Sequence, residues 1–454
     1  MDRSSEKIVE YADSLRVQDL TGECIAACKT HLLDSVGCAL GGYDSPPSRI
    51  ARAFSKTVSG RPGARVFGDG NLTSPDVAAF TNAAMLRCLD FNDTFVAGSL
   101  HPSDLIPGIL AVAEATHASG QELLLGMVLG YEIAGALAAS VSLRPRGWDQ
   151  GTFLGLATAV AAGKLLRLTP HQLGHALSLA LVPQIPLRQT RAGELSMWKG
   201  CATAAAVRNG VFAAQLAQLG MTGPPEPFEG KDGLWERVTG PFECSLPYRS
   251  DGFVLEETSL KLHPSEYHAQ AFLDLVPTIL ERVSVAQIAS IGIETYWLCY
   301  SEIGSERAKW EPDSRETADH SLPFILAIGL RDGSLTLSSF SDSNLHDAQL
   351  RSLMQRIRIE HNTEFTDRFP EELVSRLTVS SRSGQTFVVD GTYPKGHVRN
   401  PADQADLNAK FDRLAAEVVS PERRDEIRAA VARIEECEDA SVLVDSVVWA
   451  TGRR

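Results

Sequence analysis

Five long segments rich in alanine, leucine and glycine dominate the first half of this chain and determine the kind of core it can build. They span residues 105–119, 122–142, 152–166, 170–181 and 201–219. Alanine and leucine are strong helix formers, and the bounding glycines favour close approach, so these segments predict packed helices instead of a sheet. Several are apolar on nearly every side, which is typical of helices at the centre of a bundle.

The pattern changes near residue 283. Residues 288–297, 334–340 and 375–393 alternate in the manner of strands, with a hairpin turn at 381–384, and helical stretches at 320–330 and 347–357 lie between them. This mixture predicts a second, α+β domain from about residue 267 to 397. Helical segments follow at 403–419, 421–436 and 440–447, and they could pack back on the first domain.

The composition excludes several classes of partner. The chain carries 43 Lys and Arg against 57 Asp and Glu, a formal net charge of -14. Phosphate backbones and anionic lipid surfaces would repel such a chain, so we expect no nucleic-acid or membrane partner. The start has no apolar targeting segment, which predicts a cytoplasmic protein. The eight cysteines are scattered, and Cys24 and Cys28 lack further ligands nearby, so we expect no metal site.

Nucleotide-binding fingerprints are absent, and the candidate chemistry lies in short polar clusters beside apolar helices. The first cluster is LDFNDTFVAGSLHPSD, residues 89–104. We expect Asp90, Asp93 and Thr94 to share about one helical turn, with His101 on the following loop. The group could hold a base and an orienting carboxylate. Helix capping, including a cap by Ser103 or Asp104, explains these residues equally well.

Two further clusters open helices. In RPRGWDQGT, Asp149 or Gln150 lies near a helix start, where backbone N–H groups could bind a substrate carboxylate, although capping by Asp149 is the simpler interpretation. In SMWKG, Lys199 opens an apolar helix. This predicts a partly buried cation, because an idle lysine is normally placed on a solvated face.

Three clusters lie at or beyond the expected domain boundary. SLKLHPSEYHAQ crowds proton-transfer groups into a position where ligand clefts are common; its members are Lys261, His263, Glu266, Tyr267 and His268. SRETADHSLPF places Arg315, Asp319 and His320 before a helix, where Ser314 and Thr317 could equally be caps. YPKGHVRNP contains three basic residues, Lys395, His397 and Arg399, that could bind an anion. A surface turn is the alternative interpretation of this string.

Together these strings resemble the MmgE/PrpD family of 2-methylcitrate dehydratases, cis-aconitate decarboxylases and iminodisuccinate epimerases. The carriers are LDFNDT with HPSD, GWDQGT, SMWKG, KLHPSEYHAQ, RETADHSLP and PKGHVRNP, in this order over nearly the whole chain. The resemblance implies a mainly α protein and a homodimer. It also implies an all-helical domain of residues 1–266 plus 398–454, with an inserted α+β lid of residues 267–397.

The resemblance maps family site residues onto this chain. It implies roles for Asp90, Thr94, His101, Lys199 and Lys261. The decarboxylase branch has histidines where this chain has Asp149 and Glu266, and both branches often have a tyrosine at the position of Phe324. The strings WDQ, SMWKG and PSEYHAQ are similar to the dehydratase branch, which implies propionate catabolism.

The predicted function is therefore a metal-independent hydro-lyase, without cofactor, that dehydrates a 2-methylcitrate-like or citrate-like polycarboxylate. Lys199, Lys261 and Arg315 would hold carboxylates, and His101, oriented by Asp90, would exchange a proton. His268 or Tyr267 would be the second proton-transfer group. The predicted substrate-binding residues are Thr94, Asp93, Asp149, Gln150, Arg315, His320, Lys395, His397 and Arg399. The alternatives are a decarboxylase, an isomerase or epimerase, and a catalytically silent carboxylate-binding homologue.

Overall fold

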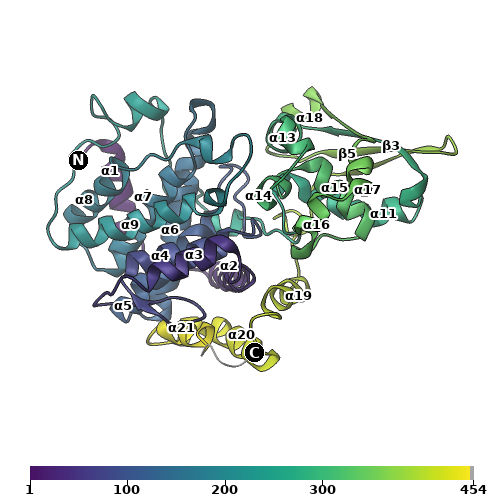
Figure 1. Ribbon diagram of the computed structural model, residues 1–454. Coiled ribbons are helices and arrows are strands. Elements are labelled where there is room, and N and C mark those ends of the chain that lie inside the picture. Colours follow the sequence, from purple (N-terminus) through teal and green to yellow (C-terminus); the bar gives the residue numbers. More distant parts are fainter. Residues whose placement is uncertain (450–454) are drawn as a thin grey trace.

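The computed structural model describes residues 1–449, and helices dominate it, as predicted (Figure 1). The helices before the expected boundary are α1 (Arg3–Ser14), α2 (Gly22–Gly41), α3 (Pro46–Ser55), α4 (Pro75–Arg87), α5 (Ile106–Thr116), α6 (Gly120–Ser140), α7 (Gly151–Leu165), α8 (Pro170–Leu181) and α9 (Ala202–Gln218). All five apolar segments are therefore helices. A small antiparallel pair, β1 (Ala64–Arg65) and β2 (Leu72–Thr73), was not predicted.

Helices α7 and α9 approach closely because glycines face each other. A Cβ atom on Gly210 would lie 2.4 Å from the carbonyl oxygen of Gly155 on α7. Helix α6 packs beside α7 and is long and apolar enough to cross a membrane, but 83% of its apolar window is buried inside the protein. We therefore interpret α6 as a core helix.

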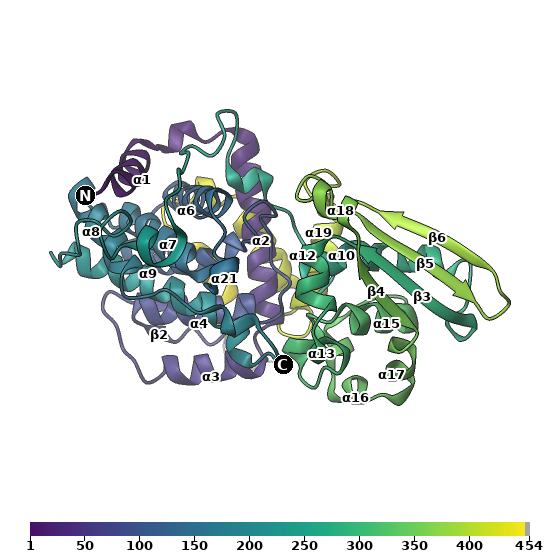
Figure 2. The same cartoon turned by 90° about the horizontal axis from the view of Figure 1, so that it is seen from above.

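The second part contains a four-stranded sheet in the order β4–β3–β5–β6. Strand β3 (Ile288–Thr295) pairs parallel with β4 (Ile357–His361) and antiparallel with β5 (Ser375–Ser381), and β5 pairs antiparallel with β6 (Thr386–Gly391). Every second residue of β5 is buried. In Figure 2 the strands lie side by side at one end of the molecule, with α15 and α17 next to them.

Short helices surround this sheet. They are α10 (Gln270–Asp274), α11 (Val276–Leu280), α12 (Trp297–Cys299), α13 (Arg307–Trp310), α14 (Arg315–Ala318), α15 (Leu322–Asp332), α16 (Asp342–Leu345), α17 (Ala348–Met354) and α18 (Thr363–Arg368). The predicted strand at 334–340 is wrong, because this segment ends in the 3-10 helix η11 (Leu337–Phe340). The backbone N–H of Thr336 donates to the Ser339 hydroxyl at 3.0 Å, a local bond that competes with strand pairing.

The last helices return to the first part. They are α19 (Gln404–Ala415), α20 (Pro421–Ala432) and α21 (Ser441–Val447). Phe411 and Leu414 of α19 pack against Gly37 and Gly41 of α2. One hydrophobic core accordingly joins residues 8–255 with residues 411–447, while a second core joins residues 267–389. The domain boundaries at 266 and 398 stay a prediction.

Candidate active site

Asp90 lies on an irregular loop that begins where α4 ends. Its backbone has a left-handed φ of 51°, which costs an L-residue roughly 1–2 kcal/mol and which aspartate tolerates better than most residues. The expected helical turn shared by Asp90, Asp93 and Thr94 is therefore wrong. Thr94 and Ser259 form a bridge through two backbone hydrogen bonds of 2.8 Å. That bridge brings Lys261 next to the loop.

The carboxylate of Asp90 is buried among three basic side chains. Arg87 donates from Nη1 to Oδ1. Nζ of Lys261 lies 3.3 Å from Oδ1 and also donates to the backbone carbonyl of Asp90 at 2.8 Å. Lys199, on η5 (Met197–Gly200), places Nζ 3.7 Å from Oδ2. All four residues are 0% exposed, so solvent screens these charges little.

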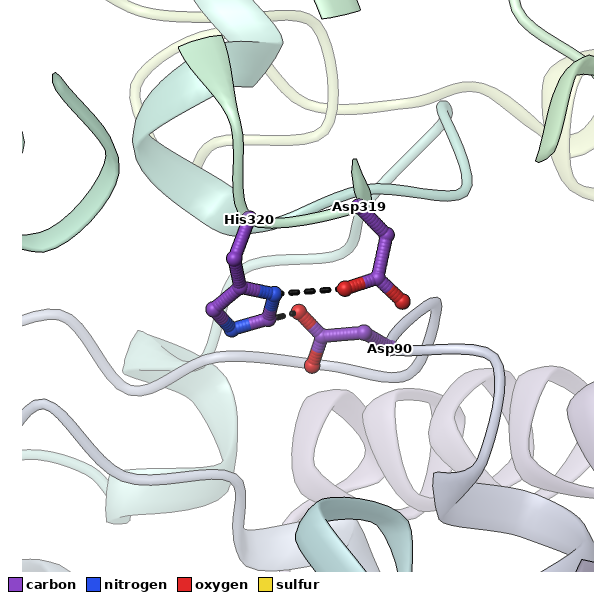
Figure 3. A group of neighbouring side chains, drawn as sticks. All are labelled: Asp90, Asp319 and His320. Carbon is purple, nitrogen blue, oxygen red and sulfur yellow. Dashed lines mark hydrogen bonds and ion pairs between the residues drawn. The ribbon is translucent and has the colours of Figure 1, made fainter. Parts of the chain in front are cut away.

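The segment between α14 and α15 adds a second carboxylate and a histidine (Figure 3). Oδ1 of Asp319 lies 3.2 Å from Nζ of Lys199 and 2.6 Å from Nδ1 of His320. The other ring nitrogen of His320 lies 3.6 Å from Oδ2 of Asp90. Arg315 places Nη1 3.9 Å from Asp319. The structure thus brings together Asp90, Lys199, Lys261, Arg315 and His320 from four separate sequence clusters.

We call this group the Asp90 cluster, and its positive charge exceeds its negative charge. Its members are Arg87, Asp90, Lys199, Lys261, Arg315, Asp319 and His320. Burial raises the pKa of a carboxyl, but Arg87, Lys199 and Lys261 hold the pKa of Asp90 well below its usual range. Burial and the nearby Lys199 lower the pKa of His320 to about 4, so this ring is neutral at pH 7.

Two further carboxyls lie beside the Asp90 cluster, and one of them, Glu266, is only partly ionised at pH 7 because burial raises its pKa to about 7. Asp104 lies beside Arg87, with Oδ2 3.4 Å from Nε, and burial raises its pKa to about 6. The four cations are Arg87, Lys199, Lys261 and Arg315. They outnumber Asp90 and Asp319, even when Asp104 is added.

His101 is held by a backbone carbonyl and not by Asp90. Its Nδ1 lies 2.7 Å from the carbonyl oxygen of Asp93 and 3.1 Å from the Thr94 hydroxyl. A carbonyl only accepts, so Nδ1 carries the proton and Nε2 is the unprotonated nitrogen. Burial, with Arg87 and Lys261, lowers the pKa of His101 well below its usual value. The expectation that Asp90 orients this ring is wrong, because Asp90 is engaged by the cations.

Glu266, His268 and Tyr296 form a polar group beside the Asp90 cluster. The backbone N–H of Glu266 donates to the Asp319 carbonyl at 2.9 Å. Nδ1 of His268 lies 2.5 Å from the Tyr296 hydroxyl, and Nε2 lies 3.8 Å from Oε1 of Glu266. Burial lowers the pKa of His268 to about 3 and raises that of Glu266 to about 7. Tyr267 packs into the second core.

Three predicted substrate ligands have protein partners that fix the fold locally. Asp93 accepts from Ser103 and from the Tyr131 hydroxyl at 2.7 Å. Asp149 pairs with Arg191 and accepts the N–H of Gly151, the first residue of α7, at 3.1 Å, but the N-cap residue of α7 is Gln150. Gln150 accepts the backbone N–H of His101 at 3.0 Å. The expected cap by Ser103 or Asp104 is wrong, since both lie inside the 3-10 helix η2 (Pro102–Leu105).

The sixth sequence cluster is not part of this group of contacts. Lys395 pairs with Asp406 at 3.1 Å, and Arg399 pairs with Glu371 at 2.9 Å. His397 stacks on Tyr393 and accepts the backbone N–H of Arg399. Their role as substrate ligands stays a prediction.

The Asp90 cluster also contains a set of atoms with metal-ligand spacing. Ligand atoms of Asp90, Asp319 and His320 lie within 4.8 Å of one another. The ammonium of Lys199 contacts both carboxylates, and Arg87 and Lys261 hold Asp90. A divalent cation would therefore have to compete with three fixed cations for the same oxygens.

Sequence reasoning did not single out Arg87, and it named Asp319 only within the cluster SRETADHSLPF, where capping explained the residues equally well. Asp319 directly precedes His320 in the string RETADH, so the sequence indicated that this carboxylate lies beside the histidine. Arg87 lies at the end of an apolar helix, and its full burial is visible only in the fold. Phe324 is 0% exposed and stacks on Phe340 in the second core.

Comparisons with known proteins agree with the sequence resemblance. The N-terminal domain model of the MmgE/PrpD family matches residues 6–247, and the C-terminal domain model matches residues 263–436. The chain is 30% identical to a 2-methylcitrate dehydratase of Cupriavidus necator, covering 93% of this chain and 92% of the relative. It is 26% identical to cis-aconitate decarboxylase of Homo sapiens, covering 97% and 93%.

Proposed function

The chain belongs to the MmgE/PrpD family, and we propose that it is a hydro-lyase that removes water from a hydroxy-polycarboxylate such as 2-methylcitrate or citrate. The surplus of buried cations in the Asp90 cluster carries this proposal. A polycarboxylate would supply the missing negative charge, whereas a neutral substrate would leave the surplus uncompensated. The 2-methylcitrate dehydratase relatives at 30% identity support the same reaction class.

His101 would act as the base. Its Nδ1–H is fixed on the Asp93 carbonyl, so the lone pair of Nε2 is free to take a proton from the carbon beside a substrate carboxylate. The lowered pKa keeps the ring neutral at pH 7, which is the protonation state a base needs.

Cations would stabilise the charge that develops when the proton leaves. Lys199, Lys261 and Arg315 come from three different segments and converge around Asp90 and Asp319. Fixed charges in a water-poor site stabilise a developing enolate more strongly than water does.

Glu266 would donate the proton that converts the departing hydroxide into water. Its pKa of about 7 leaves a substantial protonated fraction at neutral pH, whereas His268, with a pKa of about 3, is deprotonated. This proposal replaces His268 and Tyr267 as the acid and leaves His268 to hold the Glu266 carboxylate through its backbone N–H at 2.7 Å. The chemistry then requires no metal or cofactor, because Lys199 lies where a divalent cation would bind.

Decarboxylation is the second candidate, since cis-aconitate decarboxylases cover 97% of this chain. Both reactions need the same carboxylate-binding cations. They differ in whether water or carbon dioxide leaves. In this chain, Asp149 pairs with Arg191, and this contact makes Asp149 unavailable as a proton donor.

Incubation with citrate, 2-methylcitrate and cis-aconitate, followed by mass spectrometry of the products, tests the proposal. We expect a product that has lost water from a hydroxy acid. Loss of carbon dioxide would instead establish the decarboxylase. Deuterium uptake from solvent without a new C=C absorption would indicate an isomerase or epimerase, and binding without turnover would indicate a silent homologue.

We also propose a cytoplasmic homodimer, as the family resemblance implies, and a role in propionate catabolism. Light scattering of the purified full chain would test the dimer. A monomer mass would contradict it.

A further inference from the structure

Two arginines from the segments beside the first hydrophobic core form ion pairs with one glutamate that lies beside the second core. Arg144 lies on η3 (Arg144–Arg146), Arg188 on η4 (Arg188–Arg191) and Glu302 on η10 (Tyr300–Gly304). Nη1 of Arg144 lies 3.0 Å from Oε1 of Glu302, and Arg188 donates from Nη2 to the same oxygen. We call these three residues the Glu302 triad.

The Glu302 triad has more positive than negative charge. Nη1 of Arg144 is buried and has no acceptor in hydrogen-bond geometry among residues 1–449. Burial lowers the pKa of Arg144 even though Glu302 is beside it. The neighbouring Arg191, in contrast, makes two bonds to Asp149. A buried donor without an aligned acceptor is costly, so Arg144 can still bond another carboxylate oxygen.

The triad lies next to the Asp90 cluster. Arg144 and Glu302 of the triad act on the pKa of His268, and so do Lys261 and His320 of the Asp90 cluster. His268 in turn lies 3.8 Å from Glu266, whose backbone is bonded to Asp319. His268 and Glu266 are therefore close enough to both charged groups to interact with each electrostatically.

We propose that Arg144 and Arg188 form a carboxylate subsite for the substrate carboxylate farthest from the reacting carbon, and that Glu302 occupies this subsite until substrate binds. The inference rests on the proposed function, in which Lys199, Lys261 and Arg315 hold the nearer carboxylates. Exchange of one carboxylate for another keeps the arginines paired, which avoids the penalty of a buried unpaired charge. The subsite would select tricarboxylates over dicarboxylates.

Calorimetric titration with two unreactive probes tests this subsite. Propane-1,2,3-tricarboxylate carries the far terminal carboxylate, and methylsuccinate lacks it but keeps the other two. We expect Arg144→Gln and Arg188→Gln to weaken binding of the tricarboxylate about tenfold or more, and that of methylsuccinate less than about twofold. We expect Glu302→Gln to tighten tricarboxylate binding, because it removes the competing carboxylate. Arg167→Gln, whose side chain is 82% exposed, is the matched control and should change neither.

The direction of the Glu302→Gln effect separates a subsite from a purely structural ion pair. If arginine and glutamate variants weaken both probes alike and lower the Tm together, the triad only joins the two cores and the subsite is wrong. Unchanged tricarboxylate affinity in both arginine variants, or no binding by the unmodified protein, would also overturn it. Binding that follows the expected pattern without turnover of any polycarboxylate would contradict the proposed function and leave the subsite intact.

Discussion

Two buried groups of acids and bases in this molecule differ in charge balance. In the first core, Asp34 of α2 meets Lys410 of α19 at 2.6 Å, one acid with one base. In the Asp90 cluster, four cations surround Asp90 and Asp319. The balanced pair needs nothing more and joins two helices. In the unbalanced cluster the proposed substrate would neutralise the surplus charge, and this surplus, more than burial alone, separates the cluster from the structural pair.

The largest effect should come from the proposed base. We expect His101→Ala to lower kcat/KM roughly 10²–10⁴-fold with the fold retained, because general base catalysis is lost. Steady-state kinetics with the accepted polycarboxylate would measure it, and circular dichroism would check the fold. Lys199→Ala should also lower kcat/KM. Unchanged kcat/KM in both variants would refute the assignment of the Asp90 cluster as the active site.

The balanced pair should affect stability. Lys410→Met leaves Asp34 buried without its cation, which should lower the free energy of unfolding by about 3–5 kcal/mol. Urea denaturation followed by circular dichroism would measure it. The double variant Asp34→Asn with Lys410→Met is the matched control and should recover much of the loss. A single-variant loss below about 1 kcal/mol would show that the pair is not a structural contact of this kind.

Glu266 should make kcat/KM decrease at high pH. Its protonated form is the proposed acid, so kcat/KM should fall as pH rises through about 7. The folded carboxyl keeps its proton above the ordinary value of 4.5, so its contribution to stability also declines as pH rises between these values. Glu266→Gln should have low activity and no decline near pH 7. A wild-type decline that persists unchanged in Glu266→Gln would assign it to another group.

The smallest effect should come from an ion pair on the surface. Arg428 pairs with Asp412 at 2.8 Å on the exposed side of α20. Water and salt screen this pair, so Arg428→Gln should change the free energy of unfolding by less than about 1 kcal/mol. Urea denaturation of Arg428→Gln and Lys410→Met under the same conditions would measure the difference between their losses of unfolding free energy. An equal loss in the two variants would remove burial as the cause of the difference.

The sequence was sufficient to predict the apolar helices but not the contacts of Asp90. Helices α5 to α9 follow from local composition, because alanine and leucine favour helix wherever they lie. Strand β4 was missed because its pairing with β3 is a long-range contact. The left-handed turn at Asp90 and the pairing of Arg144 with Glu302, 158 residues away, depend on the assembled fold. The polar strings predicted which residues form the site, and tertiary packing decided their partners.

The contacts of Lys410 also determine when the Asp90 loop can be completed during translation. Its ammonium binds Asp34 and donates to the backbone carbonyl of Phe91, the residue after Asp90, at 2.7 Å. The ribosome makes the whole of residues 267–397 before it makes Lys410. Segments that emerge early fold first where they can, yet Asp34 has no cation until α19 emerges. A nascent chain therefore acquires its finished Asp90 loop only after the whole of residues 267–397 has been made.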